Sequence, residues 1–189
     1  MTSEQSLIRL KDGNKRYAAG KPRHTSVSYE LLNDLYVNGQ FPYAVVVGCS
    51  DSRVSVELVF DAEPGDIFVV RTAGNVIGQI EMGSIEYAVT VLKTPLVVVL
   101  SHQKCGAVRA AVDGGDFSPA IQSIINEILP SVPTTDCEDK YTACEDQNVR
   151  TMISKLLSDP YINKAFTEGN VRLIGAKYSM ETGMVSFFE

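Results

Sequence analysis

The sequence of 189 residues has little of what several classes of protein need. It has no tryptophan, two histidines and four cysteines, which are too few for a disulfide scaffold. No apolar run approaches the roughly 18 residues of a membrane span, and the first residues lack an apolar signal segment. The 17 basic residues are outnumbered by 23 acidic ones, which argues against a nucleic-acid binder. We therefore expect a cytoplasmic protein that binds neither membranes nor nucleic acids.

The residues that are present are typical of one globular domain over residues 1–189. Hydrophobic residues make up 44% of the chain and charged residues 21%, so the chain has enough apolar residues to fold. A domain of this length buries roughly 70% of the surface that its unfolded chain exposes. The sequence contains no internal repeat and no shift in composition that would mark a linker.

The hydrophobic pattern predicts an α/β fold with a mostly parallel central sheet flanked by helices, because strands alternate with helices along the chain. The predicted strands are residues 43–49, 67–71, 96–100, 171–178 and 184–188, the last as an antiparallel edge. The predicted helices after the N-terminal region are residues 83–93, 105–112, 121–128, 149–157 and 161–168. Residues 1–40 form a helical arm that opens with a capping pattern at Thr2. Residues 131–146 are polar, and we expect them to form a surface excursion.

Reactive side chains follow two of the predicted strands. Cys49-Ser50-Asp51-Ser52-Arg53 follows the first strand, and His102-Gln103-Lys104-Cys105 follows the third. Ligands of open parallel sheets bind beyond the carboxyl ends of the strands. If these two strands are neighbours, both segments face one crevice.

The residue types in these two segments indicate a zinc site. Cys49, Asp51, His102 and Cys105 offer four ligands of the kinds that Zn²⁺ prefers. A carboxylate as the fourth candidate, with Arg53 two residues on, indicates a catalytic rather than a structural zinc. Asp51 can bind the metal, or turn to Arg53 and leave the fourth position to a water whose pKa zinc lowers. The alternative for Arg53 is an ion pair that only holds the turn.

Together these segments resemble the β-class carbonic anhydrase family. The resemblance is carried by Cys49-Ser50-Asp51-Ser52-Arg53-Val54, by Pro64-Gly65-Asp66-Ile67-Phe68-Val69-Val70-Arg71 and by His102-Gln103-Lys104-Cys105-Gly106. Residues 10–17 and 175–185 are also similar to the family, so the resemblance covers nearly the whole chain. It implies a zinc lyase, with one Zn²⁺ per subunit, that converts carbon dioxide reversibly to bicarbonate and a proton.

The resemblance also implies roles for individual residues. Cys49, His102 and Cys105 would be zinc ligands. Asp51 and Arg53 would form a catalytic dyad that orients zinc-bound hydroxide, or in a closed state lets Asp51 take the fourth position on the metal.

For the substrate pocket, the resemblance implies Gln40 from the neighbouring subunit, and Phe68 and Tyr87 as walls at the dimer interface. Ala73 stands where a small apolar residue is usual, and the backbone N–H at Gly106 could serve a bound anion. Family members are at least dimeric, with N-terminal helices laid across the partner. We therefore expect a homodimer held by residues 1–40, with a tetramer as the alternative.

Two other functions stay open at this stage. One is a hydrolase of carbon disulfide or carbonyl sulfide on the same scaffold, and the other is a non-catalytic, zinc-stabilised binding or redox module. Cys137 and Cys144 are expected to be free thiols on a surface loop, with a second metal or redox pair as the alternative. His24 is expected to be solvated, with proton shuttling as the alternative.

Overall fold

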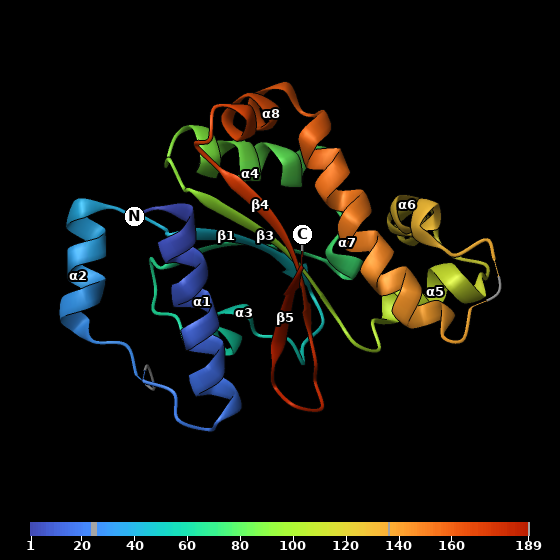
Figure 1. Cartoon of the computed structure of the whole chain (residues 1–189), viewed down its shortest axis with the longest axis horizontal. Coiled ribbons are helices and arrows are strands. Elements are labelled where there is room, and N and C mark those ends of the chain that lie inside the picture. The colour runs from blue at the N-terminus through green and yellow to red at the C-terminus, as the bar shows by residue number, and fades with distance from the viewer. Residues whose placement is uncertain (24–25, 136, 189) are drawn as a thin grey trace.

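The computed structural model describes residues 1–23, 26–135 and 137–188. His24 lies outside the described residues. Figure 1 shows a central sheet with α1 and α2 towards one end of the molecule and α5 and α6 towards the other. The helices are α1 (Ser3–Ala18), α2 (Tyr29–Asn38), α3 (Val56–Val59), α4 (Gln79–Thr90), α5 (Gly106–Asp113), α6 (Pro119–Ile128), α7 (Lys140–Ser158) and α8 (Pro160–Thr167). None of the helices among the described residues is long and apolar enough to cross a membrane.

Within the described residues the strands form one five-stranded sheet in the order β2-β1-β3-β4-β5. The strands are β1 (Ala44–Cys49), β2 (Ile67–Thr72), β3 (Leu96–His102), β4 (Arg172–Tyr178) and β5 (Val185–Phe188). The first four strands run parallel, and β5 is antiparallel to β4. The predicted α/β fold with its antiparallel edge strand is therefore confirmed.

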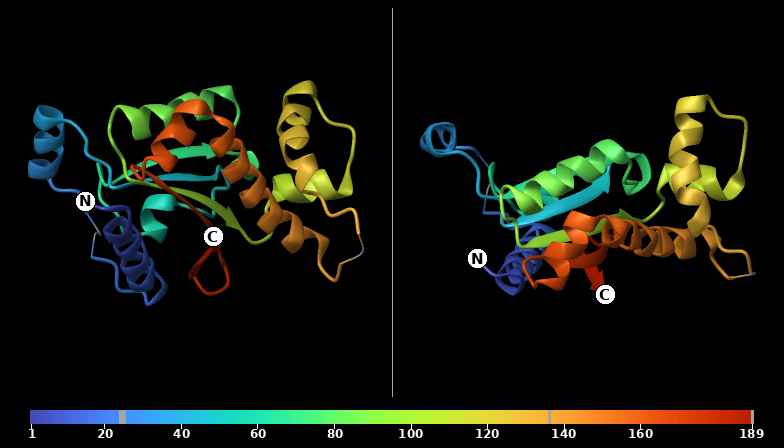
Figure 2. Two further views of the ribbon diagram at one scale, coloured as in Figure 1. Left: turned by 45° about the horizontal axis from the view of Figure 1, so that its top comes forward. Right: turned by 90° about the horizontal axis from the view of Figure 1, so that it is seen from above.

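The two central strands are buried on both faces, which explains their unbroken apolar sequences. Val45 and Val47 of β1 belong to a core that also contains residues of α4, α5, α7 and α8. Val46, on the other face, packs in a second core with residues of α1, α3 and β5. The views in Figure 2 show helices on either side of the sheet.

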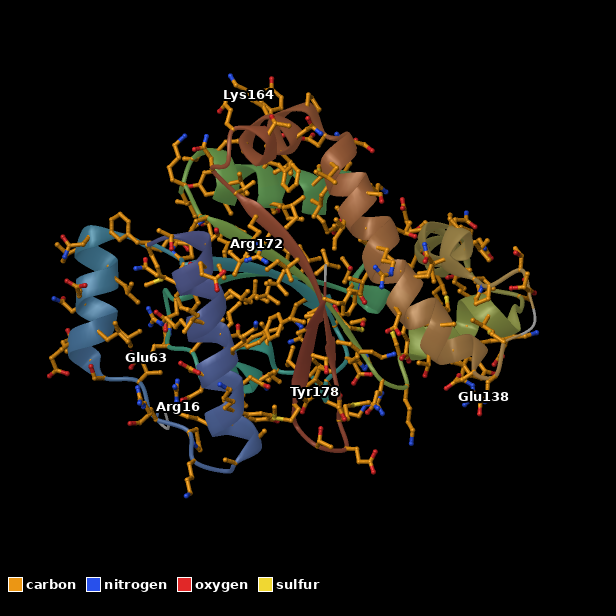
Figure 3. All side chains as sticks on the ribbon, viewed as in Figure 1. Arg16, Glu63, Glu138, Lys164, Arg172 and Tyr178 are labelled. Carbon is orange, nitrogen blue, oxygen red and sulfur yellow. The ribbon has the colours of Figure 1, made fainter. Side chains whose placement is uncertain are left out.

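The N-terminal arm, residues 1–40, contains one helix with a buried face and one with no buried residue. The predicted cap is present: the side chain of Thr2 accepts the N–H of Gln5, and the Gln5 side chain accepts the N–H of Thr2. Tyr178, labelled in Figure 3, contacts Tyr17 of α1 through their hydroxyl oxygens, 3.2 Å apart. By contrast, α2 has no buried residue and stands apart from the rest of the chain in Figure 2.

The structure differs from the prediction at residues 131–146. Helix α7 starts at Lys140, because Asp139 caps it by accepting the N–H groups of Tyr141 and Thr142. The prediction of Cys144 on a surface loop was wrong: it is fully buried in α7 and packs in the core. Cys137 is exposed, as predicted. The start of α7 was missed because polar residues separate its buried positions in the sequence.

Candidate metal centre

Neighbouring parallel strands bring the two reactive segments together. β1 pairs with β3, so Cys49 and His102 come to the same edge of the sheet. Cys105 follows three residues later, as the residue that precedes α5. The three ligand atoms lie within 4.8 Å of one another, and all three residues are buried. We call these residues the triad; the described part of the chain holds no second group of this kind.

The geometry and the chemistry of the triad fit a zinc ion. The sulfurs of Cys49 and Cys105 are 3.9 Å apart, and two Zn–S bonds of about 2.3 Å at a tetrahedral angle would separate them by about 3.8 Å. His102 Nδ1 is 2.9 Å from the carbonyl oxygen of Gln103, where an N–H at Nδ1 donates and leaves Nε2 with its lone pair free. Nε2 is buried and has no hydrogen-bond partner among the described residues.

The environment of Cys49 favours the thiolate, which is the form that binds metals. Its sulfur shares a hydrogen bond with that of Cys105 and accepts hydrogen bonds from the backbone N–H groups of Gly74, at 3.3 Å, and Asp51, at 3.4 Å. The Cys105 thiol is the largest of the causes that lower the pKa of Cys49 below its usual value. The same hydrogen bond, together with burial, raises the pKa of Cys105.

Beside the triad, Asp51 is held by Arg53. The Arg53 guanidinium donates to both carboxylate oxygens of Asp51, at 2.8 and 2.6 Å. These hydrogen bonds hold the pKa of the Asp51 carboxyl well below its usual range. The carboxylate stays 3.9 Å from Nε2 of His102, outside the triad. Arg53 also donates to the carbonyl oxygen of Lys104, at 3.2 Å, and so links the two reactive segments.

A second arginine holds the first of these segments by its backbone. Arg71, in β2, donates from Nε to the carbonyl oxygen of Cys49 and from Nη2 to that of Asp51, each at 2.9 Å. Reasoning from the sequence missed this contact: Arg71 was part of the family resemblance, but it had no assigned role.

Of the residues expected to line the pocket, Ala73 and Gly106 lie near the triad. Ala73 begins the short helix η1 (Ala73–Asn75), whose Gly74 donates to Cys49. Gly106 is the first residue of α5 and follows Cys105 directly.

The other three pocket residues lie towards the end of the sheet where β1 begins, away from the triad. Phe68 pairs with Val45, four residues and about 13 Å along β1 from Cys49. The ring of Tyr87 lies 6.4 Å from that of Phe68. Gln40 comes before β1, which begins at Ala44. A single chain therefore does not bring these residues to its own triad.

Comparison with known proteins agrees with this geometry. A sequence model described as carbonic anhydrase matches residues 44–185. The chain belongs to the β-class carbonic anhydrase family. A carbonic anhydrase of Mycolicibacterium smegmatis is 42% identical over 183 residues, 93% of this chain and 88% of the relative. Carbonic anhydrase 2 of Mycobacterium tuberculosis is 40% identical over 181 residues, 92% of this chain and 87% of the relative.

Solved structures of the family share the fold. The β-carbonic anhydrase CafA of Aspergillus fumigatus has a TM-score of 0.76 at 26% sequence identity, covering 98% of this chain and 90% of that chain. The enzyme described here is thus a carbonic anhydrase, and the general reaction of its family is the hydration of carbon dioxide.

Proposed function

We propose that this carbonic anhydrase hydrates carbon dioxide reversibly at the triad, with one Zn²⁺ bound per subunit by Cys49, His102 and Cys105. The observation that supports this most directly is the meeting of two buried sulfurs with an imidazole nitrogen that has no hydrogen-bond partner among the described residues. Zinc in such a site supplies a water whose pKa is lowered towards 7.

In this proposal Asp51 orients the attacking group. With its pKa held down by Arg53, the carboxylate is ionised at neutral pH and can only accept hydrogen bonds. It therefore accepts the hydrogen of the attacking oxygen and turns a lone pair towards the carbon of the substrate. Arg53 fixes the direction of the carboxylate by holding both of its oxygens.

The remaining pocket groups come from two chains in this proposal. Ala73 and the N–H at Gly106 lie beside the triad of their own chain, whereas Gln40, Phe68 and Tyr87 would reach the triad of a partner subunit. An exposed apolar surface on the arm supports a homodimer: Tyr29 and Tyr36 of α2 are 79% and 89% exposed. Apolar surface of this kind marks an interaction site. A tetramer built from such dimers is the alternative.

We also propose a cytoplasmic location. All four cysteines are free thiols, and the function needs two of them reduced, which suits a reducing compartment.

Stopped-flow measurement of carbon dioxide hydration, on protein of known zinc content at pH 7 and near pH 8.5, tests the function. We expect rapid hydration by the native protein and a loss of about 100-fold or more in Asp51→Ala. The variant should keep its zinc, because the triad is intact. No hydration by zinc-loaded native protein would instead favour a hydrolase of carbonyl sulfide or carbon disulfide. Full function in Asp51→Ala would favour a zinc-stabilised binding module.

A further inference from the structure

A buried carboxylate lies behind the triad, on an element that carries none of its ligands. Glu145, in the second turn of α7, has a side chain only 3% exposed. Its Oε1 accepts the backbone N–H of Cys105 at 3.3 Å, across 40 residues of sequence. Its Oε2 lies 2.8 Å from Nζ of Lys177 in β4. Figure 1 shows the start of α7 beside α5, the helix that follows Cys105.

The N–H of Cys105 needs an acceptor from outside its own helix. Cys105 is the N-cap residue of α5, and the N–H of an N-cap has no partner within the helix. The residue is 2% exposed, so water is largely excluded from it. Glu145 supplies the acceptor, and with it a fixed point for the backbone of one triad residue.

Lys177 in turn holds Glu145 in place. Its Nζ lies 2.9 Å from Asp146 as well as 2.8 Å from Glu145. Burial alone would lower the pKa of Lys177, but the ion pairs with the two carboxylates outweigh it and raise the pKa. Lys177 lies opposite Ser101 in the sheet, beside the strand that carries His102; Figure 3 labels Tyr178, the residue that follows it.

We propose that Glu145, held by Lys177, is a positioning residue of the metal centre. By fixing the backbone of Cys105, it keeps the Cys105 sulfur in ligand position opposite Cys49 and slows the loss of the metal. This inference rests on the proposed zinc site and extends it to a pair of residues that bind neither metal nor substrate.

The test compares two substitutions in the full-length, zinc-loaded protein. Glu145→Gln keeps an oxygen acceptor of the same length, whereas Glu145→Met keeps the length and loses the acceptor. Zinc release to a colorimetric chelator is timed, and the thiolate-to-metal absorption of the Co²⁺-substituted protein is recorded. We expect Glu145→Met to release zinc about 10- to 100-fold faster and to alter the cobalt spectrum. Glu145→Gln should restore both properties towards those of the native protein.

A matched control is Glu127→Met in α6. It removes the carboxylate of a more exposed ion pair with Lys155 of α7, the helix that carries Glu145. It should release zinc at the native rate. If Glu145→Met does not fold, Lys177→Met decides instead, because it removes the group that holds Glu145 and should also speed zinc release.

Native release rates and an unchanged cobalt spectrum in the folded variant would overturn the proposal. The failure of the proposed function is seen separately. If the native protein binds zinc but does not hydrate carbon dioxide, the proposed function is wrong, and the zinc-release rates still test the role of Glu145. A native protein that binds no zinc overturns both.

Discussion

Arg71 donates to the carbonyl oxygen of Cys49 at 2.9 Å, and so fixes a triad residue through its backbone rather than its sulfur. The second hydrogen bond of the same guanidinium, to the carbonyl oxygen of Asp51, fixes the residue proposed to orient the attacking group. One planar side chain thereby sets the distance between the backbone of Cys49 and that of Asp51.

Replacing Arg71 by lysine should remove at least one of these two hydrogen bonds. A single ammonium group cannot reach both carbonyl oxygens in the geometry of the guanidinium fork. We expect Arg71→Lys to keep one zinc per subunit and to lose about 10-fold in kcat for carbon dioxide hydration, with a smaller change in KM. Stopped-flow kinetics and zinc analysis of the same preparation measure both. An unchanged kcat would show that the fork is not needed for catalysis.

The two cysteines outside the triad should differ in reactivity. Cys137 is exposed, whereas Cys144 is fully buried and its burial raises the pKa to about 11. At pH 8 about one Cys144 thiol in a thousand is ionised, and burial keeps alkylating reagents away from it. Of these two cysteines, iodoacetamide should therefore label only Cys137 in the folded protein, as read by peptide mass spectrometry, and should label Cys144 as well after unfolding in urea. Equal labelling of both in the folded state would contradict the burial of Cys144.

Asn14 should be a major source of stability for the attachment of α1. Its amide donates to the carbonyl oxygens of Val59 and Gly183, and its oxygen accepts the N–H of Val185. Asn14→Ala leaves these backbone groups without a partner, so we expect the free energy of unfolding to fall by about 2–4 kcal/mol.

Urea denaturation measures this change. The control is Asn38→Ala on α2, where the side chain is exposed and donates to the exposed Asp34; it should change stability by less than about 0.5 kcal/mol. Similar values for the two variants would show that the Asn14 contacts contribute little.

The proposed dimer predicts a link between assembly and activity. Tyr36→Glu places a charge on the exposed apolar face of α2, and we expect it to weaken association in sedimentation velocity. Hydration activity should fall with the fraction of dimer, because Gln40, Phe68 and Tyr87 would reach the triad only from a partner. Tyr161→Glu, at an exposed position of α8, is the control. A fully active monomer would refute the shared pocket.

The strands and the triad could be predicted because their signals are local. β1 and β3 are runs of β-branched residues, and Cys49, His102 and Cys105 stand where those strands end. Once the strands are adjacent and parallel, these three residues meet without further information.

The supporting contacts could not be predicted, since they join side chains to backbone atoms far away in sequence. Glu145 reaches Cys105 across 40 residues, and nothing in the residues around it indicates that partner. The polar composition near Cys144 hid the start of α7 for a related reason, since only packing on the sheet shows which of its faces is buried.

Helix α2 has consequences for how the protein assembles. It has ten residues, its ends are set by Ser28 and Gly39, and it buries none of its side chains. An isolated helix of this length is marginally stable in water. If subunits associate through α2, as proposed, ordering of this helix and association are a single coupled event, and the helix content of the protein should then depend on its concentration.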